Sequence, residues 1–511
     1  MQQSSKKLAS SLTALRELQI GGRRVFRSNE LSRVHRERLL AAGFVQEAAR
    51  VWLISSSPSA RPGDSTPWYA SFWEFCACYC EDRFGTTWYL SPEQSMLVHS
   101  ENTVIPSQAV ISSTKGTNNK IELPFGTSLY DLKAPHLPLA SDLTRRDGLR
   151  LFVPEAALVR VSATYFAMQP IETRVVLNSI RESSELLRRL LEGGHSVVAG
   201  RLAGALRRVG RPALADEIVI TMRSAGYVVR ETDPFAPKDP VSALPSAEPP
   251  IVGRMRALWE SMREPVLEIF PNPPGRPRNK KVYLRMVEEV YQRDAYHSLS
   301  IEGYTVTPEL IERVRAGNWN SEQFDTDRQS RDALAARGYW QAFQAVKADV
   351  AEIITGRNAG ALLRKTHRDW YRELFQPCVV SGLIPPGAFA GYRNDAVYLR
   401  TSRYVPPRWE AVRDAMPALF ELLANEPQPG VRAVLGHWLL GYIHPYPDGN
   451  GRMARFLMNA MLASGGYPWT VIEVGDRVAY LSALDSASIQ HDIRPFARFL
   501  AERVKGAMDA S

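Results

Sequence analysis

Hydrophobic positions recur every three to four residues through most of the second half of the chain, which is the spacing of amphipathic helices. Such segments cover residues 282–303, 359–375, 406–424, 431–444, 451–466 and 477–489. The pattern predicts an all-α C-terminal region. It is interrupted at 387–407, where alternating Val397, Tyr398 and Leu399 precede prolines, and we expect a β-hairpin there.

Residues 1–60 carry three short helix signals followed by two alternating, strand-like stretches. Ser28 caps the second helix and Gly43 ends the third, an order that predicts a winged-helix-like domain. The third helix carries cations that can meet phosphates or guanine edges, at Arg33, His35, Arg36 and Arg38. A solvated basic helix face explains the same residues equally well, so the sequence does not decide whether this helix binds DNA.

Residues 61–232 mix helical and strand-like patterns, which predicts an α+β region without a catalytic cluster. The proline-rich residues 233–252 predict a linker, and 253–359 predict a further helical region. The N-terminal half, above all GRLAGALRRVGRPALADEIVITMRSAGYVVRETDPF at 200–235, resembles the AbiEi-type antitoxin and regulator proteins. The resemblance implies a regulatory region with DNA as its partner.

The chain has 511 residues, 45% hydrophobic and 23% charged, which favours several globular domains over a disordered or fibrous protein. No apolar run reaches the roughly 18 residues of a membrane-spanning helix, so no membrane partner is expected. The start, MQQSSKK, lacks the apolar segment of a signal peptide. The four cysteines form no disulfide framework, which favours reduced thiols and a cytoplasmic protein. A net charge of +9 suits an acidic partner such as nucleotide or nucleic acid.

The densest chemistry lies in HPYPDGNGRMAR, residues 444–455, between two predicted helices. A helix N-terminus offers unpaired amides and the positive end of a dipole, and glycines let those amides approach an anion. Arg452 and Arg455 lie three positions apart, so both face this anion site. Asp448 is a natural magnesium ligand beside phosphates, and His444 can accept a proton from an incoming hydroxyl.

This stretch resembles the HPFx(D/E)GNGRxxR signature of Fic (Fido) proteins, with Tyr446 where phenylalanine is usual. The resemblance implies a Fic catalytic domain at 360–503 that transfers AMP from ATP, with magnesium, to a tyrosine, serine or threonine hydroxyl of a protein, itself included. His444 would be the base and Asp448 the magnesium ligand. The nucleotide would be held by Asp448, Gly449, Asn450, Gly451, Arg452 and Arg455. A flap that docks the target as an added strand would contain Gly391, Tyr392, Val397, Tyr398 and Leu399.

A second stretch, HSLSIEGY at 297–304, resembles the inhibitory [S/T]xxxE[G/N] motif of Fic proteins. Ser298 and Glu302 lie four positions apart on one helical face, and Gly303 can end that helix at its C′ position. By this resemblance Glu302 pairs with Arg455 and occupies the cation that the γ-phosphate of ATP needs.

The expected architecture is multidomain: a winged-helix-like segment, an α+β region, and an all-α Fic fold with a β-hairpin flap. The leading hypothesis is an autoinhibited protein adenylyltransferase. Two alternatives stay open. The same site could remove AMP from a modified protein, or the chain could be a DNA-binding, antitoxin-like regulator whose Fic domain senses nucleotide.

Overall fold

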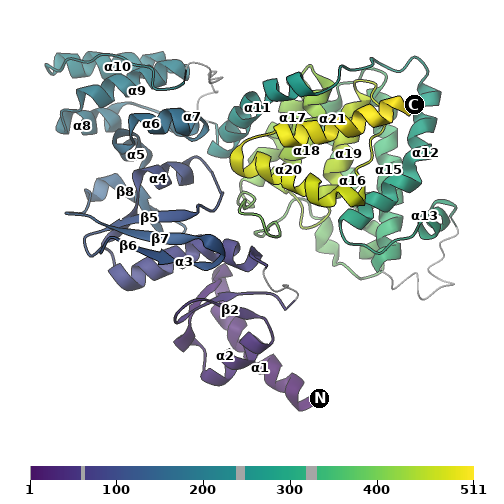
Figure 1. Cartoon of the computed structure of the whole chain (residues 1–511), viewed down its shortest axis with the longest axis horizontal. Helices are drawn as coiled ribbons and strands as arrows, with labels where there is room; N and C mark the ends of the chain where they lie inside the picture. The colour runs from purple at the N-terminus through teal and green to yellow at the C-terminus, as the bar shows by residue number, and fades with distance from the viewer. Residues whose placement is uncertain (1, 59–63, 237–247, 318–330, 511) are drawn as a thin grey trace. The chain divides into compact units, whose positions relative to one another are not determined.

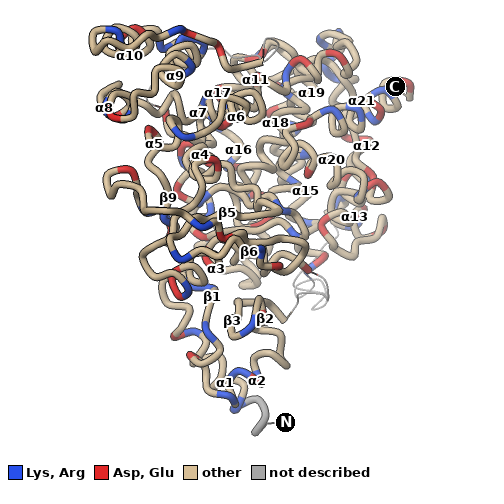
Figure 2. Tube along the Cα trace, turned by 60° about the vertical axis from the view of Figure 1, so that its left-hand side comes forward, with Lys and Arg blue, Asp and Glu red and all other residues tan. Residues whose placement is uncertain are grey.

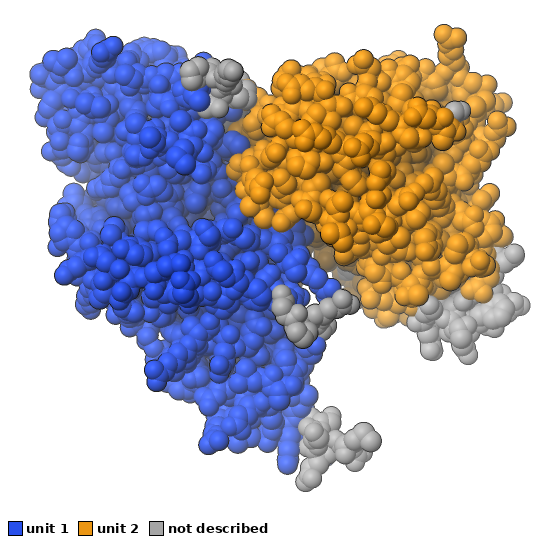
Figure 3. Space-filling view, in the orientation of Figure 1, with its two compact units in different colours: residues 1–254, 398–405 blue, residues 255–397, 406–511 orange. Residues whose placement is uncertain are grey.

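The structure is a computed structural model that describes residues 2–58, 64–236, 248–317 and 331–510 (Figure 1). Its residues divide into two compact units (Figure 3). Unit 1 comprises residues 1–254 and 398–405, and unit 2 comprises residues 255–397 and 406–511. Residues 237–247 of the predicted linker lie outside the described residues. The finer domain boundaries stay predictions.

The N-terminal part of unit 1 combines two helices with a three-stranded antiparallel sheet in the order β1-β3-β2. The elements are α1 (Gln2–Leu18), β1 (Val25–Arg27), α2 (Arg33–Ala41), β2 (Val45–Ala49) and β3 (Trp52–Ser55). Where the sequence predicts a second helix, the chain forms only a 3-10 turn, η2 (Ser28–Glu30). Strand β1 is not among the strands expected from the sequence. The winged-helix interpretation stays a prediction.

The basic side chains of α2 all contact their own chain. Arg33 pairs with Glu37 at 2.8 Å, and the His35 ring lies 2.9 Å from Ser11 Oγ. The guanidinium groups of the other two arginines donate to backbone carbonyls. These contacts account for the basic residues locally, and DNA binding stays a prediction.

The middle of unit 1 is a mixed sheet in the order β4-β5-β7-β6, in which only β5 and β7 run parallel. Its strands are β4 (Trp88–Leu90), β5 (Gln108–Ser113), β6 (Asn119–Glu122) and β7 (Ser128–Lys133). Helix α3 (Thr66–Phe84) packs its aromatic face into the same core. A separate hairpin pairs β8 (Leu143–Arg146) with β9 (Leu149–Phe152), and α4 (Pro92–His99) follows β4. The region is therefore α+β.

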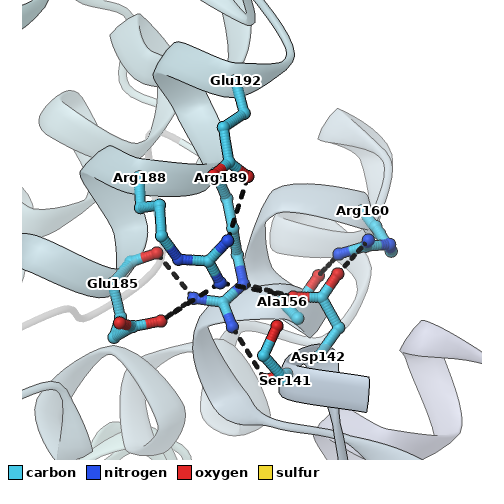
Figure 4. Close-up of polar contacts among 8 residues, drawn as sticks. All are labelled: Ser141, Asp142, Ala156, Arg160, Glu185, Arg188, Arg189 and Glu192. Carbon is cyan, nitrogen blue, oxygen red and sulfur yellow. Dashed lines mark hydrogen bonds and ion pairs between the residues drawn. The ribbon is translucent and has the colours of Figure 1, made fainter. Parts of the chain in front are cut away.

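Residues 154–224 of unit 1 form a series of helices. These helices are α5 (Pro154–Arg160), α6 (Ala163–Met168), α7 (Pro170–Ser179), α8 (Ser184–Glu192), α9 (Ser196–Arg208) and α10 (Pro212–Ser224). A polar network joins α5 and α8 to the turn that carries Asp142 (Figure 4). The nearly buried Asp142 carboxylate accepts from Arg189 Nε at 2.8 Å and from Arg160 at 2.5 Å. Because both cations come from neighbouring helices, the network has a structural role.

The described residues of unit 2 contain helices and no strand. The helices are α11 (Pro250–Ile269), in which the unit begins, α12 (Lys280–Ile301), α13 (Pro308–Arg315), α15 (Arg331–Ile353), α16 (Ala359–Val380), α17 (Val412–Asn425), α18 (Pro429–Ile443), α19 (Asn450–Ala463), α20 (Arg477–Gln490) and α21 (Arg494–Asp509). Nearly every side chain of α18 and α19 is buried. The loop between these two helices is thus held by the most enclosed elements of the unit.

The predicted β-hairpin at 387–407 is wrong. The stretch opens with a 3-10 turn, η5 (Pro386–Phe389), and continues as bends and extended chain without a strand. Tyr404 instead forms an isolated antiparallel bridge with Val104, and Ile105 N–H donates to Arg403 O at 2.8 Å. The prolines that follow lack the N–H groups a ladder needs, and residues 401–405 bond within unit 1 to residues distant in sequence.

Lysine and arginine are interspersed with aspartate and glutamate along the trace (Figure 2). Within the part of the chain that the structure describes, no helix is long and apolar enough to cross a bilayer. All four cysteines are free thiols, and burial raises the pKa of Cys76 and Cys80 above the ordinary range. These buried thiols agree with the expectation of reduced cysteines without a disulfide framework.

Candidate functional site

The candidate site is the loop that joins α18 to α19. His444 is the C-cap that follows α18; it is left-handed (φ 49°), and its N–H donates to Leu440 O at 2.9 Å. Gly449, also left-handed (φ 79°), is the N-cap of α19. The first amides of α19 have no partner within the helix and open toward the loop, so they form a place for an anion.

Asn450 fixes the shape of this loop. Its Oδ1 accepts from Tyr446 N at 2.9 Å, and its Nδ2 donates to Tyr446 O at 2.8 Å. Both ends of the side-chain amide are therefore used inside the loop. An asparagine at this position can either hold a phosphate oxygen or fix the shape of the loop. The geometry supports the second role, which leaves the backbone amides as the anion donors.

Arg452 lies on the first turn of α19 and is 1% exposed. Its guanidinium lies 5.2 Å from the ring centre of Tyr304 and 5.0 Å from that of Phe375, and its terminal nitrogen is 3.4 Å from Asp448 Oδ2. Its Nε is buried and has no hydrogen-bond partner among the described residues. A buried, orphaned donor beside an anion-binding loop is what a phosphate oxygen would satisfy.

Arg455, one turn further along α19, is held by the end of α12. Its Nε donates to Ser298 Oγ at 2.8 Å, and a terminal nitrogen lies 2.6 Å from Glu302 Oε1. Burial alone would raise the pKa of Glu302, but Arg455 and then Arg452 outweigh burial and hold that pKa below its ordinary value. Glu302 is therefore a carboxylate at neutral pH.

The Glu302 carboxylate also lies against the anion-binding loop itself. A Cβ placed on Gly451 would collide with Glu302 Oε1 and would come close to the Arg455 guanidinium. The carboxylate thus fills the space over the Gly451 backbone. Glu302 therefore both covers the loop at Gly451 and pairs with Arg455.

The end of α12 explains how Glu302 reaches this place. Glu302 is the C-cap, and Gly303 at C′ is left-handed (φ 87°). Gly303 N–H donates to Ser300 O at 3.0 Å, and Tyr304 N–H donates to Leu299 O at 3.1 Å, which is the Schellman pattern. The helix therefore ends at a fixed residue, with Glu302 directed at Arg455 and Tyr304, two residues later, directed at Arg452.

His444 is partly exposed at the lip of the loop. Burial lowers its pKa to about 4, so the imidazole is neutral at pH 7. Its Nδ1 lies 3.3 Å from Gly441 O, and a carbonyl can only accept, so Nδ1 carries the proton. Nε2 is then the atom with a free lone pair, which is the requirement for a general base.

The predicted flap residues are divided between the two units, and their role stays a prediction. Tyr392 joins the loop, because its hydroxyl lies 2.9 Å from His367 Nε2 and its ring lies 5.7 Å from that of Tyr446. Gly391 is left-handed (φ 120°), and Val397 is the last residue of this stretch in unit 2. Tyr398 and Leu399 belong to unit 1, where Arg24 lies over the Tyr398 ring at 4.6 Å.

Sequence reasoning missed several residues that shape the site. Arg393 is 2% exposed, and its Nε donates to His444 O at 2.8 Å while its backbone N–H donates to Pro445 O at 2.8 Å. Tyr304 and Phe375 enclose Arg452. A charged residue beside the predicted flap was the available signal for Arg393, whereas nothing local marks the two rings, because their role depends on tertiary packing.

Asp448 is the one carboxylate suited to a metal in the predicted set. Its side chain is 58% exposed, and Oδ1 accepts from Gly449 N at 2.6 Å. No group of three or more metal-ligating side chains occurs among the described residues. A single exposed carboxylate beside an anion-binding loop suits magnesium, which typically uses one or two carboxylates together with phosphate oxygens and water.

Comparison with known proteins agrees with this geometry. The sequence profile of the Fic/DOC family matches residues 361–462. The chain is 31% identical to a protein adenylyltransferase Fic of Nematostella vectensis over 231 residues, which is 44% of this chain and 50% of that protein. A protein of the same name from Culex quinquefasciatus is 31% identical over 234 residues, which is 44% of this chain and 42% of that protein. The chain thus spans about half the length of these curated relatives.

Solved structures of Fic proteins are more distant. A Fic domain containing signaling protein of Bacteroides thetaiotaomicron is 19% identical, with a TM-score of 0.35, over 51% of this chain and 94% of that one. Fic-1 (residues 134–508) of C. elegans is 18% identical, with a TM-score of 0.37, over 66% of this chain and 98% of that one. The family match and the sequence relatives carry the assignment: this chain contains a domain of the Fic/DOC family at residues 361–462.

Proposed function

We propose that this chain is a protein adenylyltransferase that transfers AMP from ATP to a side-chain hydroxyl of a protein and is restrained by Glu302. The observation that carries the proposal is the Glu302 carboxylate, which lies over Gly451 and pairs with Arg455 at 2.6 Å. An acidic group that fills a cationic, amide-lined loop marks that loop as an anion site. The names of the sequence relatives support ATP as the source of that anion.

In this proposal the loop binds the phosphates and His444 moves the proton. The amides at the start of α19 hold the phosphates nearest the reaction, and Arg452 and Arg455 hold the outer ones. Asp448 holds magnesium, whose charge offsets that of the phosphates. His444 Nε2 accepts the proton of the target hydroxyl. The target oxygen bonds to the α-phosphorus, the bond from that phosphorus to the β-phosphate oxygen breaks, and its electron pair leaves with pyrophosphate.

The restraint follows from competition. ATP can use Arg455 fully only if Glu302 leaves it, and bringing the γ-phosphate beside an unreleased carboxylate juxtaposes like charges. A partly shielded charge pair contributes a few kcal/mol, so the restraint is worth about a hundredfold in rate. The target hydroxyl is that of a tyrosine, serine or threonine, and one on this chain provides the simplest assay.

The test is incubation of purified variants with magnesium and each of the four nucleoside triphosphates, followed by intact-mass spectrometry. We expect Glu302→Gly to gain the mass of AMP with ATP, and we expect the same protein with His444→Ala to gain nothing. His491→Ala is the matched histidine control, since His491 is also a left-handed helix C-cap (φ 57°) but lies at the end of α20. Glu473→Gly is the matched carboxylate control, because it breaks the exposed Arg293–Glu473 pair.

The outcomes separate the parts of the proposal. One result would support both the transferase and the base: Glu302→Gly is labelled, adding His491→Ala leaves the labelling intact, and adding His444→Ala removes it. Equal labelling of the wild type, Glu302→Gly and Glu473→Gly would contradict the restraint. Absence of labelling with every nucleotide in every variant would contradict the transferase.

A further inference from the structure

A cavity of about 300 Å³ opens beside the anion-binding loop in unit 2. Its polar side is formed by Asp448, Arg452, Tyr304 and Arg331, and its other walls are apolar side chains of α15, α16 and the turn after α16. Two of the four polar residues belong to the loop already described. Arg331 does not, and the resemblance to Fic proteins assigns it no role.

Arg331 lies at the start of α15, where its charge opposes the helix dipole and the neighbouring Asp332 is the acidic residue of the first turn. Arg331 is exposed and is the first residue of α15, so its positive charge lies at the positive end of a 23-residue helix. It forms no ion pair with any described residue; its guanidinium lies instead over the ring of Tyr304, at 5.0 Å. An anion in the cavity would offset both this charge and the helix end.

A second, independent feature points to such an anion. Arg452 lies 5.2 Å from the same Tyr304 ring, so both guanidinium groups border one aromatic side chain. The Nε of Arg452 is buried and has no hydrogen-bond partner among the described residues that could satisfy it. The cavity is therefore bordered by two cations, one of them with an unsatisfied donor, and by one carboxylate that is mostly exposed.

We infer that Arg331 is a further phosphate-binding residue, which works with Arg452 to hold the outer phosphates of the nucleotide and the pyrophosphate that leaves. The inference rests on the proposed function. In that reaction the bond between the α-phosphorus and the β-phosphate oxygen breaks, and the developing charge appears on the β-phosphate. Arg331 and Arg452 offset this charge, while Arg455, which Glu302 leaves when ATP binds, holds the γ-phosphate.

The test measures pyrophosphate binding directly, by calorimetry on full-length protein with magnesium. All variants carry Glu302→Gly and His444→Ala, so that neither the carboxylate nor turnover interferes. We expect Arg331→Ala to raise the Kd for pyrophosphate about fivefold, the scale of a partly exposed charge contact. Arg331→Lys should raise the Kd for pyrophosphate less than Arg331→Ala does, and Arg331→Glu should raise it more. These increases should shrink as the salt concentration is raised.

Arg494→Ala is the matched control, because Arg494 is likewise the exposed first residue of a long helix, α21, and does not border the cavity. Its Kd should equal that of the parent. Equal Kd values for the parent, Arg331→Ala and Arg331→Glu, with unchanged melting temperatures, would overturn the inference. The inference would also be overturned if the parent protein binds no pyrophosphate while the Glu302→Gly protein with intact His444 labels itself with AMP. That result would leave the proposed transferase standing. Conversely, fivefold weakening in a protein that never transfers AMP would support a phosphate site and contradict the transferase.

Discussion

Two Arg–Glu pairs, one in each unit, show how the same contact can serve two ends. In unit 1, Arg254 and Glu172 lie 2.9 Å apart, with side chains that are 0% and 1% exposed. In unit 2, Arg455 and Glu302 lie 2.6 Å apart, and their exposures are 3% and 29%. The cations are equally buried, so the difference lies in the carboxylates.

The Glu172 carboxylate is fully buried, so it cannot exchange its partner for another one. Glu172 also accepts from Asn102 Nδ2 at 2.9 Å, so it is held from two sides within unit 1. Glu302 lies at a helix end and is partly open to solvent, whereas its arginine keeps Ser298 Oγ and Ser298 O as further acceptors. The Arg254–Glu172 pair is therefore a fixed contact. In the Arg455–Glu302 pair the carboxylate can leave while the arginine remains in place.

The largest contrast should appear in stability when the same substitution is made in both pairs. Glu172→Gln should lower the free energy of unfolding by about 3–5 kcal/mol, because Arg254 loses the carboxylate that compensates its buried charge. Glu302→Gln should cost only about 1–2 kcal/mol, since Arg455 keeps Ser298 and the site is open to water. Urea denaturation of the two variants beside the wild type measures both. Equal losses in the free energy of unfolding would mean that the two pairs contribute equally to stability, which would contradict the comparison.

A smaller effect is expected at a buried hydroxyl that has no partner among the residues the structure describes. The Tyr446 hydroxyl is fully buried and has no hydrogen-bond partner among the described residues, while its ring stacks on Tyr371 at 4.0 Å. Tyr446→Phe keeps the stacking and removes the unsatisfied hydroxyl, so it should leave stability unchanged or raise it by up to about 1 kcal/mol. Thermal unfolding measures this. A loss of more than 1 kcal/mol would show that the hydroxyl has a partner, such as an ordered water.

The smallest effect concerns pH. The folded-state pKa of Glu302 is lowered, so its pairing with Arg455 is fully present above the ordinary glutamate pKa and is lost only as pH falls through the lowered value. His444 stays neutral above its lowered pKa of about 4. The ratio of ATP affinities of Glu302→Gly and wild type should thus change less than about twofold between pH 5.5 and 8. A ratio that collapses near pH 6 would assign the restraint to another group.

The chemistry of the loop could be predicted from the sequence because it is local. His444, Asp448, Gly449 and Arg452 lie within nine consecutive residues, and the prolines and glycines among them end one helix and start the next. The pairing of Glu302 with Arg455, which the resemblance implied, also appears in the structure at 2.6 Å. The roles of these residues remain proposals.

The parts that could not be predicted depend on contacts distant in sequence. The alternation at Val397, Tyr398 and Leu399 suggests a hairpin, yet the residues that follow pair with 103–105. Helix α1 begins well before its apolar pattern, because its first residues are polar and leave no periodic signal. Arg331 is 121 positions from Arg452, and only the packing of α15 brings both to one cavity.

We propose that Glu302 occupies the cation and the loop that ATP needs. The most direct test is the Kd of magnesium–ATP, measured by calorimetry on two full-length proteins that both carry His444→Ala to prevent turnover, one with Glu302 and one with Glu302→Gly. We predict that removal of the carboxylate tightens ATP binding about a hundredfold, the scale of a few kcal/mol. Equal affinities in the two proteins would contradict the claim, since a carboxylate that ATP does not displace cannot restrain its binding.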